Sequence, residues 1–182
     1  MSSATRPRFG SSSERSIPHW PCLENLKGLA KTFALAIEEA AKLYPAAEPL
    51  IVHAALLAPE PVPLSLFSEA SNEFGEPLAS VFAGEGLDEA VAALRAFALV
   101  DREAIVDERD ALITTDAIRL HRLVREVAAA RRVGEERNKL RLALAAALAA
   151  IYPRDGFRNP SSWPRCAPLT PPRFGWAALL LR

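Results

Sequence analysis

The side chains best suited to metal binding or nucleophilic chemistry in this chain are three histidines and two cysteines, and they are widely separated. His19 and Cys22 stand three residues apart near the N-terminus, but a metal site needs three or four converging ligands and no others follow. His53 lies in an apolar stretch, where a hydrogen-bonded histidine is more common than a metal ligand. Cys166 has no other cysteine nearby, which is typical of a reduced protein rather than a disulfide framework. We therefore predict no metal site.

Paired carboxylates could offer acid–base chemistry if both acids shared one face of an element. Glu38–Glu39 and Asp88–Glu89 are neighbours in sequence. Adjacent positions on a helix point about 100° apart, so neither pair is expected to form a shared site. The sequence also lacks the motifs of a phosphate-binding P-loop, a dinucleotide fold, a zinc protease and a serine hydrolase. We therefore predict that the chain is not an enzyme and holds no cofactor of its own.

Two helices are expected in the first third of the chain. Over 27–44, apolar residues from Leu29 to Tyr44 recur at helical spacing, and Pro45 ends the pattern because its ring cannot continue the hydrogen-bond ladder. Over 47–58 nearly every side chain is apolar. A helix that is apolar on all sides is typical of the centre of a core.

A connector and a turn region follow. The alternate prolines of 59–63 predict a short stiff connector, because each proline forces the residue before it out of the helical region. Pro63 is suited to the first position of a helix over 64–74. Three glycines in 75–86 indicate a looser region, with room for one helical turn around 78–82.

Residues 87–132 carry the clearest change of period. A helical spacing over 87–97 gives way to alternation over 116–121, where Ile118 and Leu120 share one face. The helical period then returns. A helix, a two-stranded hairpin and an apolar helix in this order form the back half of a winged-helix domain. The predicted fold is therefore mainly α, winged-helix-like, with one β-hairpin and a helical appendage.

The last part of the chain begins with an alanine-rich stretch that predicts a strong helix. A proline-rich stretch without periodicity follows it. The predicted organisation is a disordered tail at 1–26, a winged-helix-like domain at 27–133, the appended helix at 134–152 and an irregular proline-rich segment at 153–182.

Composition points to a soluble protein of the cytoplasm. The 22 basic residues balance the 22 acidic ones, so no overall field draws the chain to nucleic acid or to an anionic membrane. No apolar run approaches the roughly 20 residues that span a bilayer, and the N-terminus lacks the apolar core of a secretory signal. A membrane partner is not expected.

DNA binding is the alternative function that a winged helix raises. The helix that would enter the major groove, 87–97, carries two acids and a single base, Arg95. The wing tip, 106–115, is also acidic, with three acids against one arginine. Both would be repelled by phosphate. The basic residues gather instead in 119–141, with eight bases against three glutamates, a local net charge of +5. We expect these arginines to pair with acidic protein surfaces and keep a DNA-binding regulator as the alternative.

Four stretches occur in a specific order: LLAPEPVPLSLF, LDEAVAALRAFALVD, IRLHRLVREV and YPRDGFRNPSSWPRC. Together they resemble the bacterial STAND-class regulators, which are NB-ARC-type signalling ATPases with tetratricopeptide repeats, over about residues 28–168. In that family a P-loop ATPase module precedes the winged helix and helical repeats follow it. The resemblance implies that 134–152 opens a tetratricopeptide-like array. It also implies a regulatory fragment whose partners are the ATPase module and the repeats.

The position that the resemblance singles out is His121. Leu120-His121-Arg122-Leu123 is similar to the family's Met-His-Asp-Leu motif, whose histidine contacts the β-phosphate of ADP and holds the closed state. An imidazole at a strand–helix junction can donate to a phosphate oxygen. The resemblance therefore implies a phosphate-sensing role for His121 when an ATPase module is present. Arg122 replaces the acid of the motif, and the alternative that His121 only caps the junction stays open.

Overall fold

The computed structural model describes residues 22–57, 59–155 and 158–170. The elements are α1 (Cys22–Leu43), α2 (Ala47–Ala55), β1 (Val62–Pro63), α3 (Ser65–Glu69), the 3-10 turn η1 (Ser71–Phe74), α4 (Leu78–Ala83), α5 (Gly86–Ala96), β2 (Val100–Val106), β3 (Thr114–Leu120), α6 (Arg122–Ala130), α7 (Gly134–Ile151), η2 (Pro160–Ser162), α8 (Trp163–Cys166) and η3 (Ala167–Leu169).

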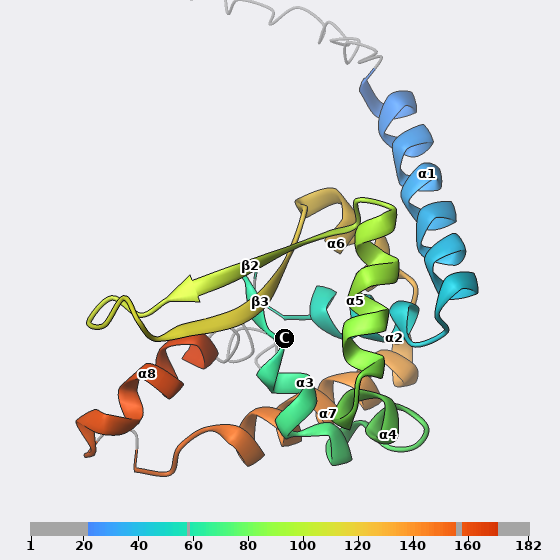
Figure 1. Ribbon diagram of the computed structural model, residues 1–182. Helices are drawn as coiled ribbons and strands as arrows, with labels where there is room; N and C mark the ends of the chain where they lie inside the picture. Colours follow the sequence, from blue (N-terminus) through green and yellow to red (C-terminus); the bar gives the residue numbers. More distant parts are fainter. Residues whose placement is uncertain (1–21, 58, 156–157, 171–182) are drawn as a thin grey trace, which may run out of the picture.

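The fold is mainly helical with one small antiparallel sheet, which confirms the predicted fold class (Figure 1). The predicted hairpin is formed by β2 and β3, which pair from Val100 opposite Leu120 to Val106 opposite Thr114. Leu120 is 4% exposed, whereas its neighbour Arg119 is exposed. The predicted alternation is therefore confirmed from Ile118 to Leu120, whereas Ala117 is buried and Asp116 is exposed.

A third strand replaces part of a predicted helix. Pro63 does not begin a helix: Val62 and Pro63 form β1, which pairs with Ile118 and Ala117 of β3. The sheet order is β1-β3-β2, so β1 lies at an edge, where a proline breaks no ladder hydrogen bond that the sheet needs. The helix starts two residues later, at Ser65.

The two ends of the described chain also differ from the prediction. Helix α1 begins at Cys22, ahead of the predicted start at Lys27, while residues 1–21 of the predicted tail lie outside the described residues. The predicted irregular segment is wrong for 160–169, which forms short helical turns. Asn159 starts them by accepting a hydrogen bond from the backbone N–H of Ser161 at 3.1 Å. Residues 153–155 and 158–159 are irregular as predicted, and 156–157 and 171–182 lie outside the described residues.

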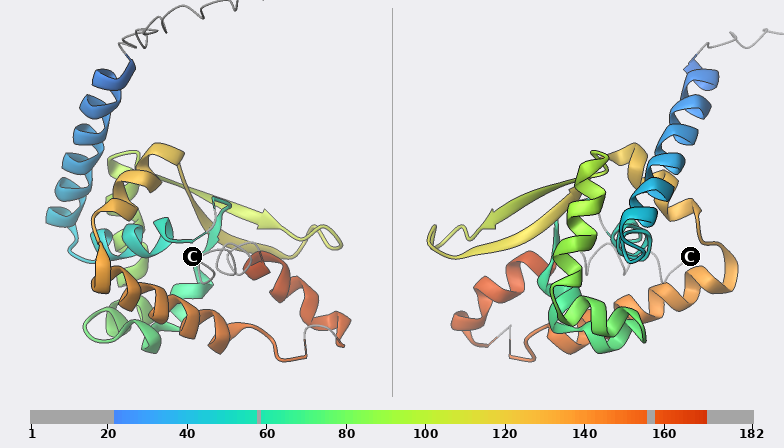
Figure 2. Two further views of the ribbon diagram at one scale, coloured as in Figure 1. Left: turned by 180° about the vertical axis from the view of Figure 1, so that it is seen from behind. Right: turned by 45° about the vertical axis from the view of Figure 1, so that its right-hand side comes forward.

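Helix α7 is part of the main core rather than a separate layer. Its side chains Leu144, Ala147 and Leu148 are buried in the same apolar cluster as α2, α3 and α5. It packs against α3 and η1, and Figure 2 shows it running along the same side of the body as α3 and α4. The predicted boundary at residue 133 therefore does not coincide with a break in the core.

The centre of the core is a cluster of aromatic rings. Phe67, which is fully buried, stands 5.5 Å from both Phe74 and Phe82, measured between ring centroids. His53 joins the cluster edge-on, 5.1 Å from Phe74. The rings come from α2, α3, η1 and α4, so the cluster packs the three short helical segments between 65 and 83 against the predicted central helix α2.

His53 is hydrogen-bonded, as predicted. The side chain is 3% exposed, and its Nδ1 lies 2.7 Å from the carbonyl oxygen of Pro49. A carbonyl can only accept, so Nδ1 carries the proton and donates. Burial lowers the pKa of His53 below its ordinary value of 6.5.

We expect the folded chain to lose stability as the pH falls below about 6.5. In this range His53 becomes protonated in the unfolded state, whereas buried His53 stays neutral in the folded state. The stability that neutral His53 contributes is fully present above the pKa that His53 has in the unfolded state. It is lost as the pH falls toward the lower pKa that His53 has in the folded state. Urea unfolding at about pH 7.5 and about pH 5.5 measures it, with His53→Gln as the control for the other titrating groups. The variant should show the weaker pH dependence. An identical pH dependence in both proteins would contradict the assignment to His53.

No helix within the described residues is both long enough and apolar enough to cross a bilayer.

Candidate regulatory interface

His121 lies where β3 ends and α6 begins. It is the N-cap of α6, with extended backbone angles of φ −61° and ψ 144°. Its Nδ1 accepts a hydrogen bond from the backbone N–H of Leu123 at 3.3 Å. The imidazole therefore satisfies one of the free amides at the start of the helix.

The cap determines which ring nitrogen of His121 can act on a ligand. Because the Leu123 amide donates to Nδ1, this nitrogen is unprotonated, and in the neutral ring the proton sits on Nε2. The side chain is exposed. Capping and ligand binding are thus compatible, since one nitrogen holds the helix while the other remains a donor. The capping contact is therefore present, and a phosphate-sensing role in addition to it stays a prediction.

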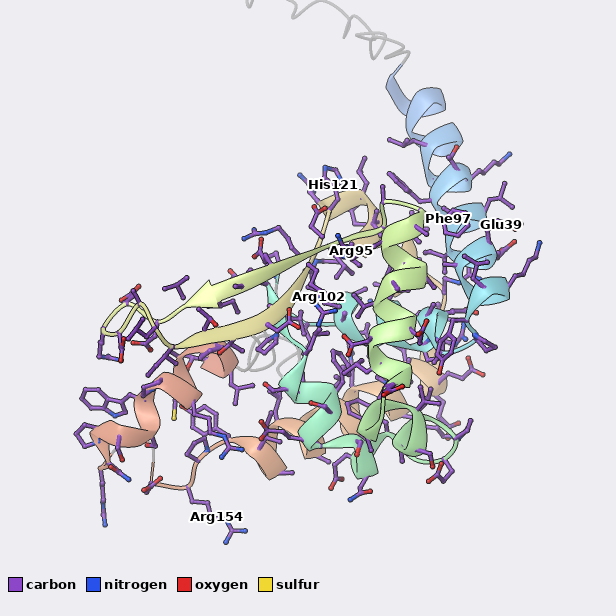
Figure 3. The ribbon with its side chains drawn as sticks, viewed as in Figure 1. Glu39, Arg95, Phe97, Arg102, His121 and Arg154 are labelled. Atoms are coloured by element: carbon purple, nitrogen blue, oxygen red, sulfur yellow. The ribbon has the colours of Figure 1, made fainter. Side chains whose placement is uncertain are left out.

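Two exposed arginines, Arg95 and Arg122, lie near this end of the sheet. The pairing of Val100 with Leu120 places the turn between α5 and β2 beside the β3–α6 junction. Figure 3 shows Arg95, from the last turn of α5, at the same end of the molecule as His121. Arg95 is exposed and, within the described residues, forms no ion pair. The side chain of Arg122 is 86% exposed and reaches Glu126 at 3.2 Å.

Much of the remaining basic stretch is neutralised inside the fold. Arg131 donates from Nε to Glu48 of α2 at 2.9 Å, and its guanidinium also lies 3.6 Å from Glu38 of α1. Arg132 reaches the same Glu48 at 3.2 Å. At these two positions the acids that pair with the arginines belong to this chain, so the pairing with acidic surfaces of a protein partner stays a prediction.

Arg125 makes a different contact, which the sequence did not indicate. Its Nη1 donates to the carbonyl oxygens of Leu57 at 2.8 Å and Ala54 at 3.3 Å, at the C-terminal end of α2. These carbonyls are the ones that a helix leaves without intrahelical partners. Burial lowers the pKa of Arg125 from its usual value. The contact fastens α6 to the central helix.

The faces that would meet DNA are acidic. The exposed positions of α5 include Asp88 and Glu89 in its first turn, with Arg95 as the only base of the helix, and α1 packs against its flank. The wing tip exposes Glu108 and Asp110. These charges repel phosphate, and the structure offers the major groove no basic helix face there.

The sequence did not predict an arginine node, in which Arg102 of β2 pairs with Asp116 of β3 and Asp88 of α5. Arg102 of β2 donates to Asp116 of β3, and its Nη1 lies 2.8 Å from Asp88 of α5. The hydrogen bonds that the guanidinium donates to Asp116, followed by the one to Asp88, raise the pKa of Arg102. The node borders a cavity of about 470 Å³. Both aspartates pair with the one guanidinium, so the node links the hairpin to α5 and carries a net charge of −1.

The other sequence candidates stay apart in the structure. Cys166 is buried in α8, far along the chain from Cys22, the first residue of α1, and His19 lies outside the described residues. Within the described ranges, no three histidine, cysteine or acidic side chains gather in a way that could hold a metal ion.

No protein-family model matches this chain, and neither a curated protein nor a solved structure matches it.

Proposed function

We propose that this chain is a non-catalytic regulatory module that relays the nucleotide state of an adjoining ATPase module to helical repeats. The observation that carries the proposal is the geometry of His121, whose capping contact uses Nδ1 and leaves Nε2–H available to donate at an exposed end of the sheet, near Arg95 and Arg122. A hydrogen-bond donor flanked by cations suits a nucleotide phosphate. The proposal agrees with the likeness of 120–123 to the phosphate-contacting motif of STAND ATPases.

The packing around α6 supports the relay. The helix begins at the His121 cap, is fastened to α2 by Arg125, and leads through residues 131–133 into α7. Helix α7 in turn packs against α3 and η1. A phosphate that moved the start of α6 would therefore shift α6 and, through it, α7. We propose that α7 is the first helix of the repeats. The likeness to the family also suggests a cytoplasmic location.

The nucleotide itself must be held mainly by the partner. The sequence has no phosphate-binding loop, so His121 and its basic neighbours could supply only one wall of a site. We propose that an ATPase module, on the same polypeptide or another, supplies the rest. The partners of this chain are then that module at the His121 end and helical repeats at α7.

A gel-shift titration separates this function from DNA binding. We expect no submicromolar binding of the full chain to mixed-sequence duplexes, because α5 and the wing tip are acidic. The titration is repeated at a second salt concentration, and Arg95→Glu is the variant most able to weaken any contact made by α5. Submicromolar binding that falls steeply with salt and is lost in this variant would overturn the regulatory proposal.

A further inference from the structure

A groove of about 370 Å³ lies between the wing tip and the C-terminal helical turns. Its walls are mainly apolar. The wing contributes Ile105, Val106 and Ile113, and the opposite wall comes from Pro164, Ala167 and Pro168. Figure 1 shows α8 lying below the hairpin on this side of the molecule.

Apolar side chains continue from the groove onto the tip of the wing. Leu112 is 92% exposed, Val106 is 52% exposed and Ile113 is 39% exposed. One exposed aliphatic residue would be ordinary, but three within eight positions beside an apolar groove form a patch. Such patches commonly mark sites of protein interaction.

The tip that carries the patch is held in shape by local contacts. The carboxylate of Asp107 accepts from the backbone N–H groups of Arg109 at 2.8 Å and Asp110 at 3.2 Å. The carboxylate of Asp110 accepts from the N–H of Leu112 at 2.9 Å. The guanidinium of Arg109 lies over the ring of Trp163, 4.8 Å from its centroid, and so links the tip to α8. The groove is thus preformed, which lowers the entropy lost on binding.

The charge of the tip selects the kind of partner. Asp107, Glu108 and Asp110 oppose Arg109 alone, a net charge of −2 beside the apolar patch. Nucleic acid and anionic lipid would be repelled. A segment with lysine or arginine next to large apolar side chains would place its cations against these carboxylates while its apolar groups fill the groove.

We propose that the wing groove docks a basic, apolar segment of a protein partner. This surface is separate from the His121 end: Figure 3 places His121 at the opposite end of the hairpin from the tip. It goes beyond the proposed function, because it predicts a second protein contact that needs no nucleotide.

The test uses the full chain and a dye-labelled peptide of alternating leucine and lysine, with a leucine–glutamate peptide as the matched probe. Anisotropy should show saturable binding of the lysine peptide only. Leu112→Ser should weaken this binding about tenfold, since an exposed anchor is lost without disturbing the core. Glu108→Lys should weaken it and reduce its salt dependence.

Two variants serve as matched controls elsewhere on the surface. Leu142→Ser removes a leucine that is 67% exposed on α7, and Glu89→Lys reverses an exposed acid on α5. Both should leave peptide binding unchanged. Equal loss in the controls, or equal binding of both peptides, would overturn the proposal. So would binding that appears only after removal of 171–182, or a concentration-dependent dimer that Leu112→Ser abolishes, because the occupant would then be this chain itself.

Discussion

Replacement of Phe67 by alanine is expected to destabilise the folded chain by about 3–5 kcal/mol. The side chain is fully buried against Phe74 and Phe82, so its removal leaves a cavity that these two rigid rings cannot fill. The loss is a large share of the stability of a typical domain. Urea unfolding measures it as a lower midpoint with an unchanged slope.

The control for this prediction is Leu35→Ala, since Leu35 is 56% exposed on α1 and its loss should change stability by no more than about 0.5 kcal/mol. If Phe67→Ala is already unfolded without denaturant, Phe67→Leu should give a smaller, measurable loss. A change below about 1 kcal/mol for Phe67→Ala would show that the aromatic cluster is not the centre of the core.

Replacement of His121 by alanine in a protein that joins this module to an ATPase should weaken the ADP-held resting state about ten- to a hundredfold. One hydrogen bond to a charged phosphate is worth roughly 1.5–3 kcal/mol, and its loss shifts the population by that factor. The expected sign is faster ADP release and more spontaneous signalling. The release rate of a fluorescent ADP analogue measures the effect directly.

The control separates phosphate sensing from capping. An aspartate at position 121 would also accept from the Leu123 amide, so His121→Asp keeps the helix cap but offers no donor and places a negative charge beside the phosphate. We expect this variant to unfold like the wild type yet to release ADP at least as fast as His121→Ala. Wild-type release from His121→Asp would show that the imidazole serves only as a cap.

Local patterns were enough to predict the elements that bury one face. The alternation at Ile118 and Leu120 gave the buried face of β3, and the apolar run after Pro45 gave the central helix α2. The short element β1 was missed because two residues show no period, and because Pro63 reads locally as a helix start. Its strand character comes from pairing with β3, across more than fifty positions of sequence.

The contacts that fasten the elements together were the least predictable. The arginine node joins residues of three different elements: Asp88, Arg102 and Asp116. Each is fourteen positions from the next, and nothing in their local sequence links them. Arg125 likewise reaches the end of α2 through tertiary packing. His121 was singled out because its neighbours resemble a short family motif, whereas its capping contact follows from where β3 ends.

The most direct measurement is calorimetry with ADP and magnesium, titrated into the full chain alone. If the phosphate-binding loop must come from a partner, the titration should give no saturable heat at micromolar ADP. The His121→Asp variant should give the same titration curve as the wild type. A single saturable site of micromolar affinity that His121→Asp abolishes would contradict the proposal, because the chain would then hold the nucleotide by itself.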